Sequence, residues 1–299
     1  MWGWPVGVYL FLGGLSSGTF VTVAVLQLAH GGRFARTTRW GSLLCVGALL
    51  LGIFALVADI GVPLRALNMV ASFSHVSTSW MARGAWALLG CGILFGAYAL
   101  LAWLPAGGAL APWLRQYRQP VLNLLGILGL PFAVFLGLYT GRLLGASMGI
   151  ESWRTPLLAA LFLLSAFETG CTCVTAILGS LERTGMALRR TVRRLDAMAL
   201  LLMVAEACTA AAYAHHVVAT GTLTAILSKQ GSLTATVTLC LVFLVALLSC
   251  ILLTALHLLL RRRGGTCGRA VAMASCTAGI ALRFTILSVG VHTSPLAIW

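Results

Sequence analysis

Only six acidic residues occur among the 299 of the chain, and two of them, Glu168 and Glu206, stand inside long apolar stretches. A carboxylate in such surroundings must be protonated, be paired with a cation or face water, because an isolated buried charge is very costly. Arg283, also inside an apolar stretch, needs a partner for the same reason. These three residues are candidates for steps of a proton path. Alternatively, both acids are neutral and bonded to nearby hydroxyl groups, such as those of Thr169 and Thr209.

Another acidic residue, Asp59, lies at the end of an apolar stretch and is followed closely by Pro63 and Arg65. Proline cannot continue a helix, so the chain should turn there and bring Arg65 back towards Asp59. One interpretation is an ion pair that fixes the turn at the membrane surface. The other is that the pair handles protons or orients the polar head of a ligand.

Two tyrosines, Tyr9 and Tyr139, lie one or two turns inside their apolar stretches, on the same predicted side as Asp59. A phenol at that depth can hydrogen-bond a carbonyl or hydroxyl group while its ring packs against an apolar tail. The tryptophans on that side are interpreted as ordinary interface residues.

Eight apolar segments carry these residues, and their hydropathy predicts transmembrane helices. Hydrophobic residues make up 60% of the chain and charged residues 9%, and the mean hydropathy is +0.99, outside the range of soluble domains. About 20 apolar residues are needed to cross the hydrocarbon core. We expect one all-α membrane domain over residues 1–299. The predicted helices run roughly over residues 4–29, 40–61, 82–104, 119–144, 155–180, 195–218, 233–260 and 269–291.

Arginine is concentrated in every second connector between these segments, which together hold most of the 20 basic residues. Short loops rich in Lys and Arg stay on the cytoplasmic side, so both termini are expected outside. The net charge of +14 then reflects topology and contact with anionic lipid, and it does not indicate nucleic-acid binding.

Cysteine, histidine and glycine give no sign of a metal or haem site in this sequence. The nine cysteines fall mostly inside apolar segments and form no CxxC pair, so we expect neither a metal site nor a disulfide. No two histidines face each other at mid-depth, so haem b is not expected. The repeat Gly14-xxx-Gly18 predicts a close contact between helix backbones.

An ordered set of motifs resembles the NrfD/PsrC family, the quinone-reactive membrane subunits of polysulfide, nitrite and related respiratory reductases. Residues 59–65, which read Asp-Ile-Gly-Val-Pro-Leu-Arg, are similar to a family segment Asp-Leu-Gly-x-Pro-x-Arg after the second helix. The resemblance covers most of the chain. Its other parts are residues 2–18, 79–86, 139–144, 153–158 and 162–170, with Gly279, Arg283 and Gly290.

The resemblance implies eight helices in two four-helix bundles, without haem, and a menaquinone or ubiquinone site near the outer face. By position, Tyr9 and Tyr139 match the contacts to the quinone head, and Asp59 and Arg65 match its rim. Relatives can carry a histidine or asparagine near the position of Tyr9, so His75 is a further candidate for the proton acceptor.

The resemblance also implies partners in a bacterial or archaeal cytoplasmic membrane. These are a multi-cluster ferredoxin-like iron–sulfur subunit and a periplasmic catalytic subunit of molybdopterin type. Because the chain has no redox centre and no catalytic residue of its own, it is expected to be an electron-transfer subunit and not a self-sufficient enzyme. Two alternatives stay open: a secondary transporter, with helices broken at mid-depth, and a structural anchor without quinone chemistry.

Overall fold

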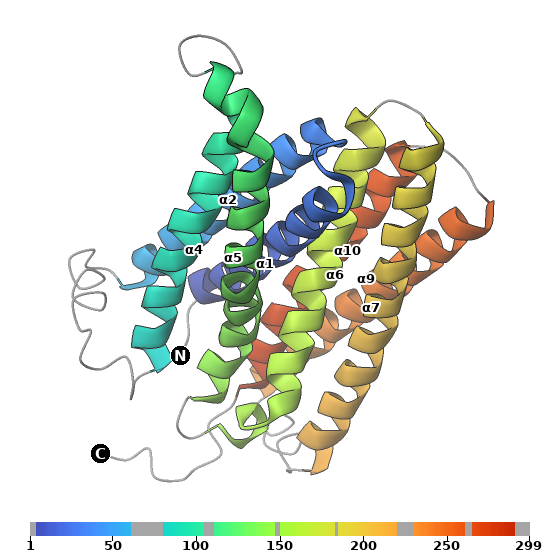
Figure 1. The fold of residues 1–299 in the computed structure, drawn as a ribbon. Coiled ribbons are helices and arrows are strands. Elements are labelled where there is room, and N and C mark those ends of the chain that lie inside the picture. Colours follow the sequence, from blue (N-terminus) through green and yellow to red (C-terminus); the bar gives the residue numbers. More distant parts are fainter. Residues whose placement is uncertain are drawn as a thin grey trace.

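The computed structural model describes residues 4–60, 80–104, 111–146, 150–182, 185–219, 230–260 and 265–290. These residues form long helices and one short 3-10 helix, with no strand among them (Figure 1). The elements are α1 (Trp4–His30), α2 (Ala35–Ile60), α4 (Trp80–Trp103), α5 (Ala111–Gly145), η2 (Glu151–Trp153), α6 (Pro156–Leu181), α7 (Met186–Ala219), α9 (Gln230–Leu260) and α10 (Gly265–Val289).

Each of the eight predicted segments coincides with a helix that is long and apolar enough to cross a membrane. The largest differences are at the starts of two helices. α5 begins at Ala111, whereas hydropathy predicts a start at residue 119, and α7 begins at Met186, whereas hydropathy predicts residue 195. Hydropathy detects only the part of a helix inside hydrocarbon. Arginine is a good helix former, so the helices continue as polar turns beyond that part.

The helices run alternately up and down, which gives the molecule two ends (Figure 1). The end where α2, α5, α7 and α10 begin is called here the arginine-rich end, and the opposite end, where α1 begins and α10 ends, the termini end. Exposed or half-buried arginines occupy the first turns of all four helices that begin at the arginine-rich end. They include Arg36, Arg39, Arg118, Arg189, Arg190, Arg193, Arg194 and Arg269.

Two helices, α1 and α6, form the centre of the molecule. α1 packs against α2, α5, α6 and α10, and α6 also packs against α7. Their backbones touch at two glycines: a Cβ on Gly18 would overlap the carbonyl of Ala166, and a Cβ on Gly170 would overlap the backbone of Gly18. The predicted close contact at Gly14-xxx-Gly18 is therefore confirmed, and its partner is α6.

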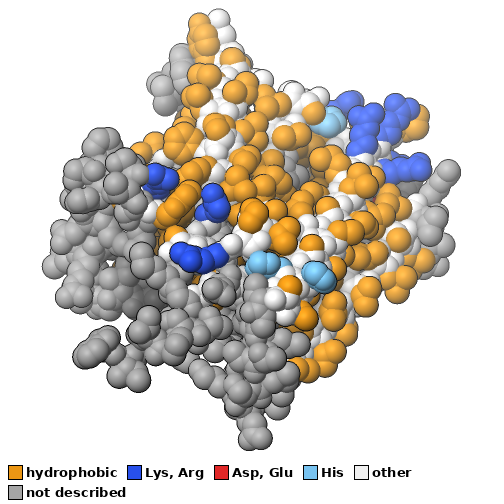
Figure 2. All heavy atoms as spheres, turned by 90° about the horizontal axis from the view of Figure 1, so that it is seen from below, with side chains coloured by type: hydrophobic (Ala, Val, Ile, Leu, Met, Phe, Trp, Pro, Cys, Tyr) orange, Lys and Arg blue, Asp and Glu red, His pale blue; other side chains and the backbone are white. Residues whose placement is uncertain are grey.

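The outer surface of the described helices is apolar. Among the coloured residues in Figure 2, hydrophobic side chains predominate and basic side chains form a few separate groups. The exposed residues include Phe54, which is 73% exposed, Leu201 at 71% and Leu252 at 69%. Large apolar residues on the outside and serine, threonine and glutamate inside are the reverse of a soluble protein, and they are typical of helices in lipid.

Candidate functional site

The structure describes five of the eight predicted site residues with their side chains: Tyr9, Tyr139, Glu168, Glu206 and Arg283. Of the remaining three, Asp59 lies in the last turn of α2, and only its backbone belongs to the described part. The other two predicted site residues, Arg65 and His75, lie outside the described residues. The five described residues form two separate groups, a tyrosine pair and a charged cluster.

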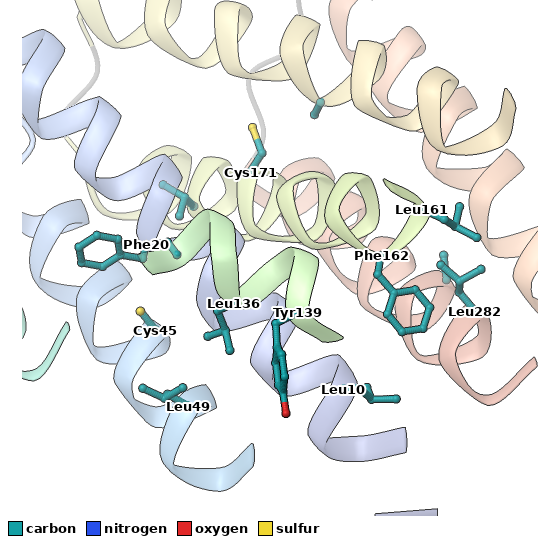
Figure 3. Packing of buried hydrophobic residues seen from close by; sticks show 14 of the residues in the cluster. Leu10, Phe20, Cys45, Leu49, Leu136, Tyr139, Leu161, Phe162, Cys171 and Leu282 are labelled. Carbon is teal, nitrogen blue, oxygen red and sulfur yellow. The ribbon is translucent and has the colours of Figure 1, made fainter. Parts of the chain in front are cut away.

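The tyrosine pair lies between α1 and α5 near the termini end. Tyr9 is 1% exposed and Tyr139 is 5% exposed, and their phenol groups are close enough to interact electrostatically. Both belong to one hydrophobic cluster with Leu10 of α1 and Leu49 of α2; Figure 3 shows Tyr139 with these two residues.

Two glycines on neighbouring helices lie beside the rings, and one of them, Gly84, makes room for a phenol. A Cβ added to Gly52 of α2 would lie 3.7 Å from the Tyr9 ring, in ordinary contact. A Cβ added to Gly84 of α4 would overlap the phenolic oxygen of Tyr139. The position of this phenol therefore depends on the missing side chain at Gly84, a contact that local sequence does not reveal.

The phenolic oxygen of Tyr9 is buried and has no hydrogen-bond partner in the described part of the chain. Leaving such a group unpaired costs about 1–3 kcal/mol, so buried hydroxyl groups normally have partners. An unpaired phenol beside a second phenol can bind the carbonyl or hydroxyl group of a ligand. The apolar walls around both rings suit the rest of an amphipathic molecule.

Three further residues form a basic and aromatic group at the same end of the molecule. The guanidinium carbon of Arg83 lies 4.8 Å from the centre of the Trp80 ring, and that of Arg142 lies 5.5 Å from it. Arg142 follows Tyr139 by one helical turn, towards the termini end. From sequence, Trp80 was interpreted as an interface residue and the two arginines had no predicted site role. Arg83 follows Trp80 by three residues and Arg142 follows Tyr139 by three, and this helical spacing was the only hint in the sequence that each arginine lies near an aromatic ring.

The charged cluster lies between α1, α6, α7 and α10, and Arg283 of α10 is its cation. Arg283 is 1% exposed. Its Nη1 donates to Ser165 Oγ at 2.6 Å and to the carbonyl of Gly279 at 2.9 Å. The guanidinium also lies beside the rings of Phe11 and Phe162, with ring-centre distances of 5.8 and 5.2 Å.

The two carboxyl groups of the cluster, Glu206 and Glu168, interact electrostatically with this arginine. Glu206 of α7 interacts with the charge of Arg283. Glu168 of α6 accepts a hydrogen bond from Ser275 at 2.6 Å and a longer one from Thr169 at 3.3 Å. One oxygen of each carboxyl group and the Nε of Arg283 have no partner within the described residues.

The hydroxyl partners of the acids were predicted correctly for one acid and not for the other. Thr169 does bond to Glu168. Thr209 instead donates to the backbone carbonyl of Ala205 at 2.7 Å, because a threonine in a helix readily bonds one turn back. Glu206 instead interacts with the charge of Arg283 on another helix, which neighbouring sequence could not indicate.

The charged cluster lies near the middle of the helices. Glu168 is 12 residues from the start of α6 and Glu206 is 13 residues from the end of α7, which places them about 18–20 Å from the termini end at 1.5 Å per residue. Arg283 is nearer that end, but its guanidinium reaches back to Gly279, about 15 Å deep by the same measure. The three charges therefore share one depth.

Comparisons with known proteins identify the family of this chain. A family model described as "Polysulphide reductase, NrfD" matches residues 1–295. The C chain of polysulfide reductase from Wolinella succinogenes is 28% identical over 190 residues, which cover 57% of this chain and 56% of the relative. Protein NrfD of Escherichia coli is 33% identical over 192 residues, which cover 57% of each protein.

The C subunit of selenate reductase from Mesobacillus selenatarsenatis is 24% identical over 237 residues, which cover 69% of this chain and 56% of the relative. The chain thus spans a little over half the length of these curated relatives. The family match, in contrast, extends over nearly the whole chain. With eight helices able to cross a membrane, this multi-pass membrane protein belongs to the polysulphide reductase NrfD family.

Proposed function

We propose that this chain is the membrane anchor and quinone-binding subunit of a respiratory oxidoreductase complex. It exchanges electrons between the menaquinone or ubiquinone pool and an iron–sulfur partner subunit. The observation that carries the proposal is the buried, unpartnered phenol of Tyr9 next to the phenol of Tyr139. On the family resemblance, we propose that Asp59 and Arg65 belong to the rim of this site and that His75 is a further candidate for the proton acceptor.

The described residues fit such a ligand. A bound quinone would provide the redox group, which can take up or release two electrons and two protons. Tyr9 offers a hydroxyl group that has no partner among the described residues, so binding need not break any bond described here. Tyr139 orients the head from the opposite helix, and the apolar walls around both rings hold the tail.

Orientation follows from the arginines. Because positively charged connectors stay in the cytoplasm, we infer that the arginine-rich end faces inward and that both termini lie outside. The tyrosine pair then lies towards the extracytoplasmic face, in the first of two groups of four helices, α1–α5 and α6–α10. All eight helices form a single membrane domain.

The partners are proposed to dock at the termini end. They are a multi-cluster ferredoxin-like iron–sulfur subunit and, beyond it, a periplasmic catalytic subunit of molybdopterin type. The relatives named as parts of polysulfide and selenate reductases support assembly into such a complex. The group of Trp80, Arg83 and Arg142 lies at this end and offers positive charge to an acidic partner surface.

Quinone binding can be tested on the purified chain without its partners. A short-chain menaquinone analogue is titrated in detergent, and binding is read from quenching of tryptophan fluorescence. Tyr139→Phe removes one hydrogen bond worth about 0.5–1.5 kcal/mol, so Kd should rise about 2- to 12-fold. Tyr213→Phe is the matched control, because Tyr213 is also a buried tyrosine near the termini end, on α7.

Two outcomes contradict the proposal. If the wild-type chain does not bind the analogue, the interpretation as a purely structural anchor is favoured. If Tyr139→Phe and Tyr213→Phe weaken binding equally, the analogue binds elsewhere or non-specifically. A specific loss with Tyr139→Phe supports the tyrosine pair as the contact to the quinone head.

A further inference from the structure

The charged cluster contains two acids and one cation in a part of the molecule that excludes solvent. Glu168 is 2% exposed, and Glu206 and Arg283 are each 1% exposed. If both acids were ionised, the cluster would carry a net negative charge in surroundings where uncompensated charge costs several kcal/mol. If one acid holds a proton, the cluster is neutral.

The direction of α10 keeps the cation inside. Side chains on a helix point towards its N-terminus, and α10 begins at the arginine-rich end. Arg283 therefore extends away from the nearer helix end and deeper into the bundle, as its bond to the Gly279 carbonyl shows. An arginine serving only to reach the interface would extend the other way.

Space for the guanidinium is also built in. A Cβ added to Gly14 of α1 would lie 2.9 Å from Arg283 Nη2, so a larger residue there would displace the cation. Ser165 of α6 fixes the cation by accepting a hydrogen bond from Arg283, and Glu206 of α7 interacts with the charge so placed. The cluster is thus held together by contacts from four helices.

We propose that Glu168 and Glu206 share a single exchangeable proton, with Arg283 as the compensating charge, and that they form a proton-loading site inside the membrane. The unpartnered oxygen of each acid and the unpartnered Nε of Arg283 are the groups to which water can bind. A buried water typically makes about three such bonds, and it gives the proton a way to exchange. This proposal does not depend on the quinone site.

Among the described residues, the other groups on the helices packed around the cluster carry no charge that would replace this balance. α1 contributes Phe11 and glycines, and α6 and α10 contribute hydroxyl and thiol groups. Asp196 of α7 lies ten residues from Glu206 towards the arginine-rich end, about 15 Å away along the helix. The titratable neighbours that interact electrostatically with the two acids are Cys171, Cys173, Cys250 and Cys276.

Infrared difference spectroscopy of the full-length chain in detergent or liposomes tests the proposal, because a protonated carboxyl group has its own carbonyl band. The chain has only six acidic residues, so bands can be assigned with single variants. At neutral pH the wild type should show one such band, and it should shift in D2O. Glu168→Gln and Glu206→Gln should each abolish it, because the remaining acid then pairs with Arg283 as a carboxylate.

Arg283→Gln should act in the opposite direction. Without the cation both acids are expected to be protonated, so the intensity of the band should about double. Glu182→Gln is the control, since Glu182 lies at the arginine-rich end and accepts bonds from Thr37; it should leave the band unchanged. Absence of the band in the wild type, its survival in either glutamate variant, or its failure to shift in D2O would overturn the proposal. The glutamate variants keep the test decisive if Arg283→Gln does not fold.

Discussion

Replacing Tyr9 by phenylalanine distinguishes two effects of its unpartnered hydroxyl group: the loss of stability in the quinone-free chain and the contribution to quinone binding. The change removes one oxygen atom and keeps the ring that packs in the hydrophobic cluster. That oxygen is buried without a partner in the described structure, which costs about 1–3 kcal/mol in the folded state. In the quinone-free chain, Tyr9→Phe should therefore raise the free energy of unfolding by up to about that amount.

Quinone binding should change in the opposite direction. If Tyr9 donates to or accepts from the quinone head, its loss removes about 0.5–1.5 kcal/mol of binding free energy, a rise in Kd of about 2- to 12-fold. A variant that is more stable when empty and weaker in binding is difficult to explain by general damage to the fold.

Tyr98→Phe provides the matched control. Tyr98 of α4 is also fully buried with an unpartnered hydroxyl group among the described residues, but it packs against Phe20 further from the termini end. Its variant should gain stability without any change in Kd. Both variants are measured by unfolding in mixed detergent micelles and by the quinone titration. Destabilisation by Tyr9→Phe, or an unchanged Kd, would refute the assignment of this phenol.

Three further predictions follow from the packing and the charges. Gly84→Ala should displace the phenol of Tyr139 and weaken quinone binding at least as much as Tyr139→Phe does. Gly92→Ala is the control, because a Cβ there meets open space, and it should leave quinone binding unchanged. Gly18→Ala should separate the two central helices and cost about 1–3 kcal/mol of stability in detergent unfolding; Gly47→Ala, with no neighbour in reach, should have little effect. Glu206→Gln in the intact complex in liposomes should keep quinol turnover but reduce the protons translocated per electron, and an unchanged ratio would exclude the cluster from translocation.

The helices and several buried polar groups could be predicted from the sequence, because both follow from local composition. Twenty apolar residues in a row require a membrane-spanning helix, and this requirement located all eight. The rarity of acids identified Glu168 and Glu206 as special before any contact was known. The start of α7 at Met186 was missed because its first turns are polar.

Contacts between distant segments could not be predicted in the same way. Ser165 and Arg283 are 118 residues apart, and nothing near either residue indicates the other. The same holds for Gly84 and Tyr139, whose close approach depends on how two helices cross. Helix packing in lipid relies on such shape matching instead of a hydrophobic driving force, so it leaves only a weak local pattern.

The inward-pointing guanidinium of α10 has a consequence for how the protein is made. An arginine buried deep in a membrane helix costs about 2.5–3.5 kcal/mol on insertion into the bilayer, and the helix that carries Arg283, α10, follows α6 and α7 in the chain. The groups that receive this side chain, on α6 and α7, have by then already been synthesised. Integration of α10 is therefore coupled to assembly with the helices before it, and variants that remove Ser165 should leave α10 partly uninserted.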